Sequence, residues 1–347
     1  MQTIKDKKIS IGLLLLASFL FLLPLTSHAL TISPPRVELE ADPGVTISGK
    51  MKLINGEESD QTFYSSFENF EAKGETGVPS FIESKEDLAG WMSTNSQITV
   101  KKGEEVVIDY SITVPKNAEP GGHFAAIFWN TTPPQNSQIA VGAKIGMLVL
   151  LKVSGPIKEG GGILEFSTKN NQKFFTSLPV NFFYRFQNSG ADRAKPKGEI
   201  KIKNILGITS NKVDANPVEG NILPNSIRRF EMTWENSDKN YISQAEDGFI
   251  LKFFNNVKQE WHNFAFGRYK ADLNIVYGSQ NIPAFSSVAL WVFPWHLLLI
   301  TLIIVIAIVL LGRREISKYN KWVVSSAIKN FKSAQETIKK IGGKPRI

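Results

Sequence analysis

The sequence predicts a mainly β protein, in which two tandem immunoglobulin-like β-sandwich domains precede one C-terminal transmembrane helix and a basic cytoplasmic amphipathic helix. Three observations indicate this fold class. Short segments of alternating apolar and polar residues recur along the chain, which is typical of strands with one buried face. A glycine-rich stretch divides these segments into two sets. Near the C-terminus, 24 consecutive residues contain no Asp, Glu, Lys or Arg, and about 20 apolar residues suffice to cross a bilayer.

The first 29 residues have the pattern of a secretory signal peptide. Three lysines precede the apolar run 11–25, and Ser27 and Ala29 place small residues at the −3 and −1 positions of a signal-peptidase site. We expect cleavage after Ala29. The alternative is an uncleaved anchor helix, which the short apolar core and Pro24 disfavour.

Residues 30–155 are predicted to form the N-terminal β-sandwich. Alternating segments indicate strands at residues 36–41, 45–53, 105–114 and 123–129. One further segment of this domain, residues 139–153, is apolar on both faces except at Lys144 and Lys152, which predicts a central strand or a strand pair.

A glycine-rich linker, residues 156–161, leads to a second predicted β-sandwich over residues 162–278. Residues 279–287 are expected to form a short stalk before the membrane. Alternating segments of the second domain lie at residues 180–187, 199–203, 229–234 and 269–277.

The charge-free run 288–311 is predicted to span the membrane. Trp291 and Trp295 would lie at the membrane interface, and Arg313 and Arg314 would hold the following tail in the cytoplasm. Positive charge is retained on the cytoplasmic side, so the two sandwich domains are expected outside the cell.

The cytoplasmic tail, residues 312–347, carries most of the positive charge of the chain. It contains ten basic and two acidic residues, whereas residues 30–311 have a net charge of −2. The high isoelectric point therefore does not indicate a nucleic-acid partner. Apolar residues recur in the tail at steps of three and four between lysines, which predicts a basic amphipathic helix for the anionic leaflet or a partner helix.

Few groups suited to catalysis occur in the predicted exterior. The chain has no cysteine, which excludes thiolate chemistry and disulfides. His123 begins a predicted strand with no identifiable catalytic partner, and His262 belongs to the other domain. Glu38 and Glu40 share one strand face, but Arg36, Lys50 and Lys52 suggest cross-strand charge pairs rather than a glycosidase pair. We expect a protein that is not an enzyme and needs no cofactor.

Two further patterns are compatible with ligand binding. Residues 236–247 place Asn, Asp and Asn at the first, third and fifth positions of a calcium loop, but Tyr241 replaces the required glycine. We predict no metal site there and regard an exposed turn as the better interpretation. Four tryptophans could stack on sugars, although most are expected in the cores: Trp91, Trp129, Trp234 and Trp261.

Several motifs resemble the WxL-interacting family of bacterial cell-surface proteins. The resemblance implies a peptidoglycan-binding-like first domain, a host-binding-like second domain and WxL-type protein partners. Because the motifs are strand and turn signatures, they imply no ligand-binding residue. The motifs are ISPPRVEL (32–39), DPG (42–44), LAGW (88–91) and VPKNAEPGGHFAAI (114–127) in the first domain, and NSGAD (188–192), PKG (196–198), LPNS (223–226) and FGRY (266–269) in the second.

The sequence therefore predicts a membrane-anchored, non-catalytic surface protein that binds peptidoglycan or other cell-wall polymer, surface proteins, or both. One alternative is a two-domain chaperone-like protein that lends a strand edge to secreted subunits. A second alternative is a cell-wall glycan hydrolase.

Overall fold

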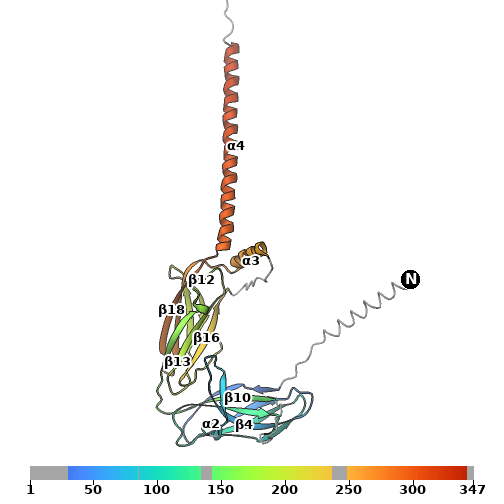
Figure 1. The fold of residues 1–347 in the computed structure, drawn as a ribbon, viewed down its shortest axis with the longest axis vertical. Helices are drawn as coiled ribbons and strands as arrows, with labels where there is room; N and C mark the ends of the chain where they lie inside the picture. The colour runs from blue at the N-terminus through green and yellow to red at the C-terminus, as the bar shows by residue number, and fades with distance from the viewer. Residues whose placement is uncertain (1–29, 85, 134–142, 237–247, 342–347) are drawn as a thin grey trace, which may run out of the picture.

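The computed structural model of the protein describes residues 30–84, 86–133, 143–236 and 248–341. It confirms the predicted fold class: the chain is mainly β, with immunoglobulin-like sandwich domains and one long C-terminal apolar helix. Figure 1 shows the first domain set at an angle to the second, from which the helix extends. The predicted signal peptide lies outside the described residues.

Two sheets form the first domain. One has the order β1-β3-β8-β6, with β1 (Thr31–Ser33), β3 (Thr46–Ile54), β8 (Glu105–Thr113) and β6 (Met92–Thr94). The other has the order β2-β10-β9-β4-β5, with β2 (Arg36–Ala41), β10 (Lys144–Val153), β9 (Gly121–Asn130), β4 (Gln61–Ala72) and β5 (Pro79–Ile82). Strand β7 (Gln97–Val100) also pairs with β4, and the short helix α2 (Leu88–Trp91) precedes β6.

Strand β10 is central, which explains why its sequence is apolar on both faces. It pairs antiparallel with β9 over its whole length and parallel with β2 from Leu148 to Val153. Met147, Val149 and Leu151 enter the domain core between the sheets, while Leu148 and Leu150 lie on the opposite face. This outer apolar face is turned toward the second domain, where Leu223 packs against it.

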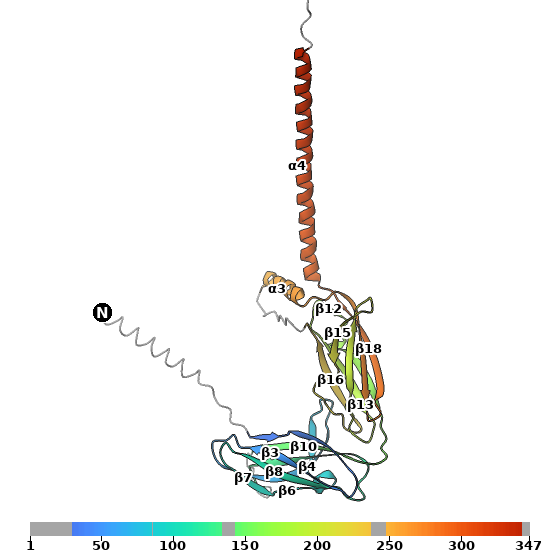
Figure 2. The same ribbon diagram turned by 180° about the vertical axis from the view of Figure 1, so that it is seen from behind.

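The second domain is also a sandwich of two sheets (Figure 2). The smaller has the order β11-β13-β16, with β11 (Gly161–Thr168), β13 (Val180–Asn188) and β16 (Ser226–Trp234). The larger has the order β12-β18-β17-β14-β15, with β12 (Phe174–Phe175), β18 (Ile282–Val292), β17 (Gly267–Tyr277), β14 (Lys197–Lys203) and β15 (Thr209–Asp214). A 3-10 turn, η1 (Lys169–Asn171), follows β11.

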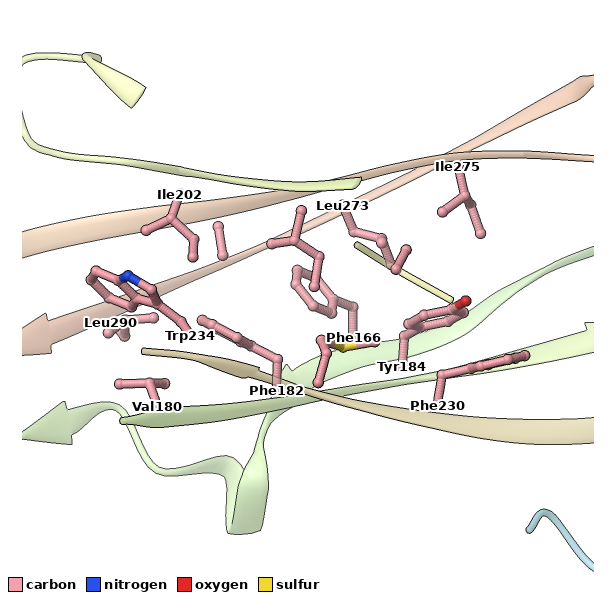
Figure 3. Close-up of a cluster of buried hydrophobic side chains, with 14 of the residues drawn as sticks. Phe166, Val180, Phe182, Tyr184, Ile202, Phe230, Trp234, Leu273, Ile275 and Leu290 are labelled. Carbon is pink, nitrogen blue, oxygen red and sulfur yellow. The ribbon is translucent and has the colours of Figure 1, made fainter. Parts of the chain in front are cut away.

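Aromatic side chains dominate the core of the second domain. Figure 3 shows Phe182, Tyr184 and Trp234 between the two sheets, facing the aliphatic side chains of Leu273 and Leu290. The alternation of the sequence predicts these contacts, because every second residue of a strand points to the same face. Large apolar side chains line both inner faces, and their burial stabilises the domain, which contains no disulfide.

The boundary between the second domain and the long apolar helix differs from the sequence prediction. Residues 279–287 are not a stalk, because β18 begins at Ile282 and pairs with β17 along its length. The helix predicted to span the membrane does not begin at residue 288, because β18 continues to Val292. Leu290 and Val292 are buried in the core. An uncharged apolar run is compatible with either a buried strand or a membrane helix, so composition did not separate them.

Helix α4 (Trp295–Ile341) is continuous for 47 residues, about 70 Å at 1.5 Å per residue. It is long and apolar enough in its first half to cross a membrane. The charged tail, predicted as a separate amphipathic helix, continues the same helix. A second helix, α3 (Phe249–His262), was not predicted and lies beside the first turn of α4 (Figures 1 and 2).

Candidate functional site

A hairpin of the first domain, which connects β4 and β5, contacts the second domain. At its tip, Glu75 accepts hydrogen bonds from Arg185 of β13, at 2.8 Å from Nε and 2.5 Å from Nη2. The backbone carbonyl of Glu75 also accepts the N–H of Arg229 at 2.8 Å. The Arg185 guanidinium holds the pKa of Glu75 below its ordinary value. The hairpin therefore covers part of the outer edge of β16.

Glu38 forms a second connection between the domains. Its carboxylate accepts hydrogen bonds from Asn221 Nδ2 at 2.8 Å and from Lys195 Nζ at 3.0 Å, and Arg193 Nε lies 3.7 Å away. Burial by itself raises the pKa of Glu38, but the bonds to Asn221 and Lys195 outweigh it and lower the pKa below its ordinary value. The ionised carboxylate is therefore the form that holds the domains together.

A third contact involves the first residues of β9. The N–H of Gly122 donates to the carbonyl of Ala191 at 2.9 Å. Gly121 has a φ of +134°, and a Cβ there would lie 2.7 Å from the Ala191 carbonyl oxygen. A side chain at Gly121 is therefore excluded by both its own backbone conformation and the second domain.

Between these contacts lies a cleft with about 540 Å³ of unoccupied space, its open mouth included. The apolar side chains of its first-domain wall come from β4 and β10: Phe70, Leu148 and Leu150. Those of the second-domain wall precede or begin β16: Ile222, Leu223 and Ile227. The hairpin that carries Glu75 forms the rim, with Gly77 and Val78.

Two guanidinium groups line this apolar cleft. Arg228 Nη1 donates to the carbonyl of Asn221 at 2.7 Å, while its buried Nε has no hydrogen-bond partner. No carboxylate among the described residues forms an ion pair with Arg228. Burial and the nearby charge of Arg36 lower the pKa of Arg228. A partly buried cation without a counter-ion loses part of its hydration, and an entering anion would offset that loss.

Gly77 and Gly220 create the space that Arg228 occupies. A Cβ at Gly77 would lie 2.3 Å from Arg228 Cζ, and a Cβ at Gly220 would lie 2.7 Å from the same atom. The guanidinium thus passes between a backbone segment of each domain. Its position depends on both glycines.

A free strand edge adjoins the cleft. Strand β2 pairs with β10 only from Leu148 onward, and among the described strands only β9 pairs with residues 144–147. Arg36 lies opposite Leu148, at the end of this open edge. An extended segment added there would continue the line of β2 and end next to Arg36.

The structure gives His123 partners that the sequence did not reveal. Its Nδ1 lies 2.5 Å from Asp87 Oδ1, its Nε2 lies 2.8 Å from the carbonyl of Glu119, and Trp91 packs on the ring. Burial lowers the pKa of His123, but the bonds to Asp87 and Glu119 outweigh it and raise the pKa above its ordinary value. Both ring nitrogens face acceptors, which favours the charged imidazolium. The expectation that His123 lacks a partner was wrong.

Other candidates from the sequence are placed apart. Glu40 pairs with Lys152 at 3.6 Å, whereas Glu38 faces the second domain. Lys50 and Lys52 are not their cross-strand partners, because β3 belongs to the other sheet and its lysines pair with Asp109 and Glu105. Residues 237–247 of the calcium-loop pattern, Asp247 included, lie outside the described residues. His262 is in α3.

Trp129 and Trp234 are core residues, as expected, and Trp91 is partly buried. Trp261 is not in a core, since 69% of it is exposed on α3.

The four residues predicted to define the membrane boundary occupy two elements. Trp291 lies in β18 and Trp295 begins α4, and both are exposed. Arg313 and Arg314 lie within the continuous α4 helix, directly after its charge-free part.

Arg228 was not predicted from the sequence as a candidate binding residue. It belongs to a strand that reads as an ordinary alternating segment. The only available signal was its neighbour Arg229, since two consecutive arginines place one on each face of a strand.

Comparison with known proteins gives structural matches only: no family model matches, and no curated protein matches. The class 5 fimbriae chaperone CfaA is 12% identical, with 77% of this chain and 100% of that chain covered and a TM-score of 0.37. The chaperone–tip adhesion subunit complex CsuC–CsuE of Acinetobacter baumannii is 11% identical, with 76% and 98% covered and a TM-score of 0.34. The chaperone DraB of E. coli is 8% identical, with 77% and 98% covered and a TM-score of 0.30. At this similarity none of the matches assigns a function.

Proposed function

We propose that this chain is a membrane-anchored binding protein that holds an extended segment of a protein partner in the cleft between its two domains. The observation that carries the proposal is the half-buried side chain of Arg228, whose buried Nε has no hydrogen-bond partner and which lies beside Arg36 in an apolar cleft. The segment it fits is apolar and carries a carboxylate, either an acidic side chain or a chain terminus.

The open edge of β10 supports an extended rather than a helical ligand. Backbone groups of residues 144–147 can pair with an added strand, and Leu148 and Leu150 offer apolar contacts beside it. A strand that runs parallel to β10 along this edge would direct its C-terminal end toward Arg36. Arg36, Asn221 and Arg228 place N–H donors in the cleft, which suit the binding of a carboxylate, and Arg36 also lies 3.5 Å from the Glu38 carboxylate.

Anchoring is assigned to the first half of α4. In this proposal residues 295–311 cross the membrane, the sandwich domains lie outside the cell, and Arg313 and Arg314 hold the remainder of α4 in the cytoplasm. The binding cleft would then face the surroundings of the cell. Such a position suits a protein that captures newly secreted polypeptides or holds surface proteins at the membrane.

A peptide assay tests the proposal. Full-length protein in detergent is titrated with extended apolar peptides that end in a free carboxylate, and with the same peptides amidated at that end. We expect the free carboxylate to bind more tightly, and Arg228→Gln to abolish the difference. Arg268→Gln, on the exposed face of β17 in the same domain, is the matched control and should keep it. Equal binding of both peptides to the unaltered protein would contradict the proposal.

Binding to the cell wall is the second candidate function, and it rests on the resemblance to WxL-interacting proteins. Its test is retention of the same full-length protein on purified sacculi. Retention that is unaffected by Arg228→Gln, together with no peptide binding, would favour the wall-binding function over the cleft function. Retention that needs a WxL-type protein on the sacculi would instead favour protein partners.

A further inference from the structure

Helix α3 has an apolar face that no part of the described chain covers. Ile250, Phe254 and Trp261 are 68%, 57% and 69% exposed. With the half-buried Val257 they follow one another at steps of four, three and four residues, so they share one face of the helix. Lys252 and Gln259 lie on the opposite face. Exposed aromatic residues of this size, gathered on one face, mark an interaction surface.

Contacts along another face fix α3 to the first turn of α4. Glu260, which is only 1% exposed, pairs through Oε1 with His296 Nδ1 at 2.6 Å. Its Oε2 accepts the backbone N–H of Leu297 at 2.8 Å, one of the free donors at the start of α4. Asn256 bonds His296 Nε2 at 3.2 Å, and Phe253 packs against the rings of Trp295 and His296. The position of α3 is therefore set by the residues that begin α4.

The direction of α3 differs from that of α4. In Figures 1 and 2, α3 lies across the foot of α4 and does not run along it. If α4 crosses the bilayer from residue 295, its first turn lies at the membrane surface, and α3 lies at the same level and roughly parallel to that surface.

Further exposed aromatic residues surround this point. They lie in the segment before β17, at the end of β18 and at the start of α4: Phe264, Phe266, Trp291, Phe293 and Trp295. Aromatic rings are favoured at the boundary between lipid and water, and lysines of a surface helix attract anionic headgroups. Lys252 and Lys258 are the basic residues of α3 besides the terminal His262, and Glu260, its acidic residue, is buried.

We propose that α3 is a membrane-surface helix, whose face of Ile250, Phe254, Val257 and Trp261 inserts into the interfacial layer of the bilayer. The occupant of this face is lipid. A single spanning helix leaves the exterior domains free to rotate and tilt about it, whereas a second element in the surface holds the second domain at one angle. This inference rests on the proposed membrane crossing of α4.

Spin labels test the position of α3. The chain has no cysteine, so single cysteines at Phe254, Lys252 and Ile304 can each carry a nitroxide in the full-length protein. The protein is placed in nanodiscs of phosphatidylcholine and phosphatidylglycerol, and collisions with oxygen and with a water-soluble nickel chelate are measured. Phe254 and Lys252 are exposed, so their labels leave the packing intact, which an unchanged thermal melt verifies.

We expect the label at 254 to collide mainly with oxygen, at a depth of about 5–10 Å in the headgroup and acyl boundary. The label at 252 should collide mainly with the nickel chelate. If the label at 304 lies in lipid but the label at 254 collides with the nickel chelate as often as the label at 252, the surface position of α3 is overturned and the anchoring is not. Protection of 254 from both reagents would also overturn the surface position of α3, because protein would then cover the face. A label at 304 outside lipid would overturn the proposed anchoring itself.

Discussion

Glu75 and Arg185 form a two-bond ion pair across the domain interface, although 110 residues separate them in the sequence. The pair holds the β4–β5 hairpin against the second domain, so it limits changes in the angle between the domains. We expect Glu75→Gln to broaden the distribution of distances between dyes at Ser93→Cys and Ser279→Cys. Glu71→Gln, on the exposed part of β4, should leave it unchanged. An unaltered distribution in Glu75→Gln would mean that the cleft is held by other contacts.

Acid should loosen the interface. The pKa values of Glu38 and Glu75 are lowered in the folded protein from their ordinary value of 4.5. Their contribution is therefore complete above pH 4.5 and lost as pH falls through the lower folded-state values. The same dye pair should report opening of the domains below pH 4.5. At neutral pH, Glu38→Gln should open the domain interface as acid does in the unaltered protein. The expected loss is roughly 1–2 kcal/mol in the free energy of domain association. Opening at pH 6 would contradict this assignment.

The first domain should lose stability toward alkaline pH. The pKa of His123 is raised above its ordinary value of 6.5 by Asp87 and Glu119 despite the opposing effect of burial. The ion pair is fully present below pH 6.5 and lost as pH rises through the folded-state pKa. Because Asp87 is 45% exposed, the effect should stay within about 1 kcal/mol. Urea midpoints at pH 5.5 and pH 8.5 measure it, and His123→Gln should abolish the difference between them.

Gly121 should tolerate no side chain. Gly121→Val would combine an unfavourable φ with a clash at the Ala191 carbonyl, at a cost of about 2 kcal/mol or more. Gly162→Val in β11 is the control, since its Cβ would meet open space and its φ is not positive. Thermal melts should show a lower midpoint for Gly121→Val only. Equal melting midpoints for the two variants would mean that the interface accommodates a valine side chain at Gly121 without loss of stability.

The topology of α4 can be tested by labelling. In intact cells a cysteine at Ser279, in the turn before β18, should react with a membrane-impermeant maleimide, and one at Ser333 in α4 should react only after permeabilisation. Both serines are exposed, so access to the protein surface is not the limiting factor. The reverse pattern of labelling would place the sandwich domains in the cytoplasm and remove the basis for a surface function.

Helix α3 shows why some elements could not be predicted from the sequence. Its apolar residues lie at helical spacing, but they are exposed, and Glu260 reads as a surface residue although it is buried against His296. An amphipathic pattern indicates that a face is covered by something and does not indicate what covers it. The start of α4 was misplaced for a similar reason, because residues 288–292 are as apolar in a strand as in a membrane helix.

The sequence by itself determined the alternating strands, the two sandwich domains and the long apolar helix, because alternation and charge-free length are local properties of the chain, but it did not reveal β4 or β18. Only the tertiary structure decided which residues meet across the domains. Arg228 lies in the cleft with Arg36 because β16 of one domain faces β2 and β10 of the other. His123 meets Asp87 because β9 passes the segment before α2. Such contacts depend on sheet order and on the angle between domains, and no local pattern of residues encodes either one.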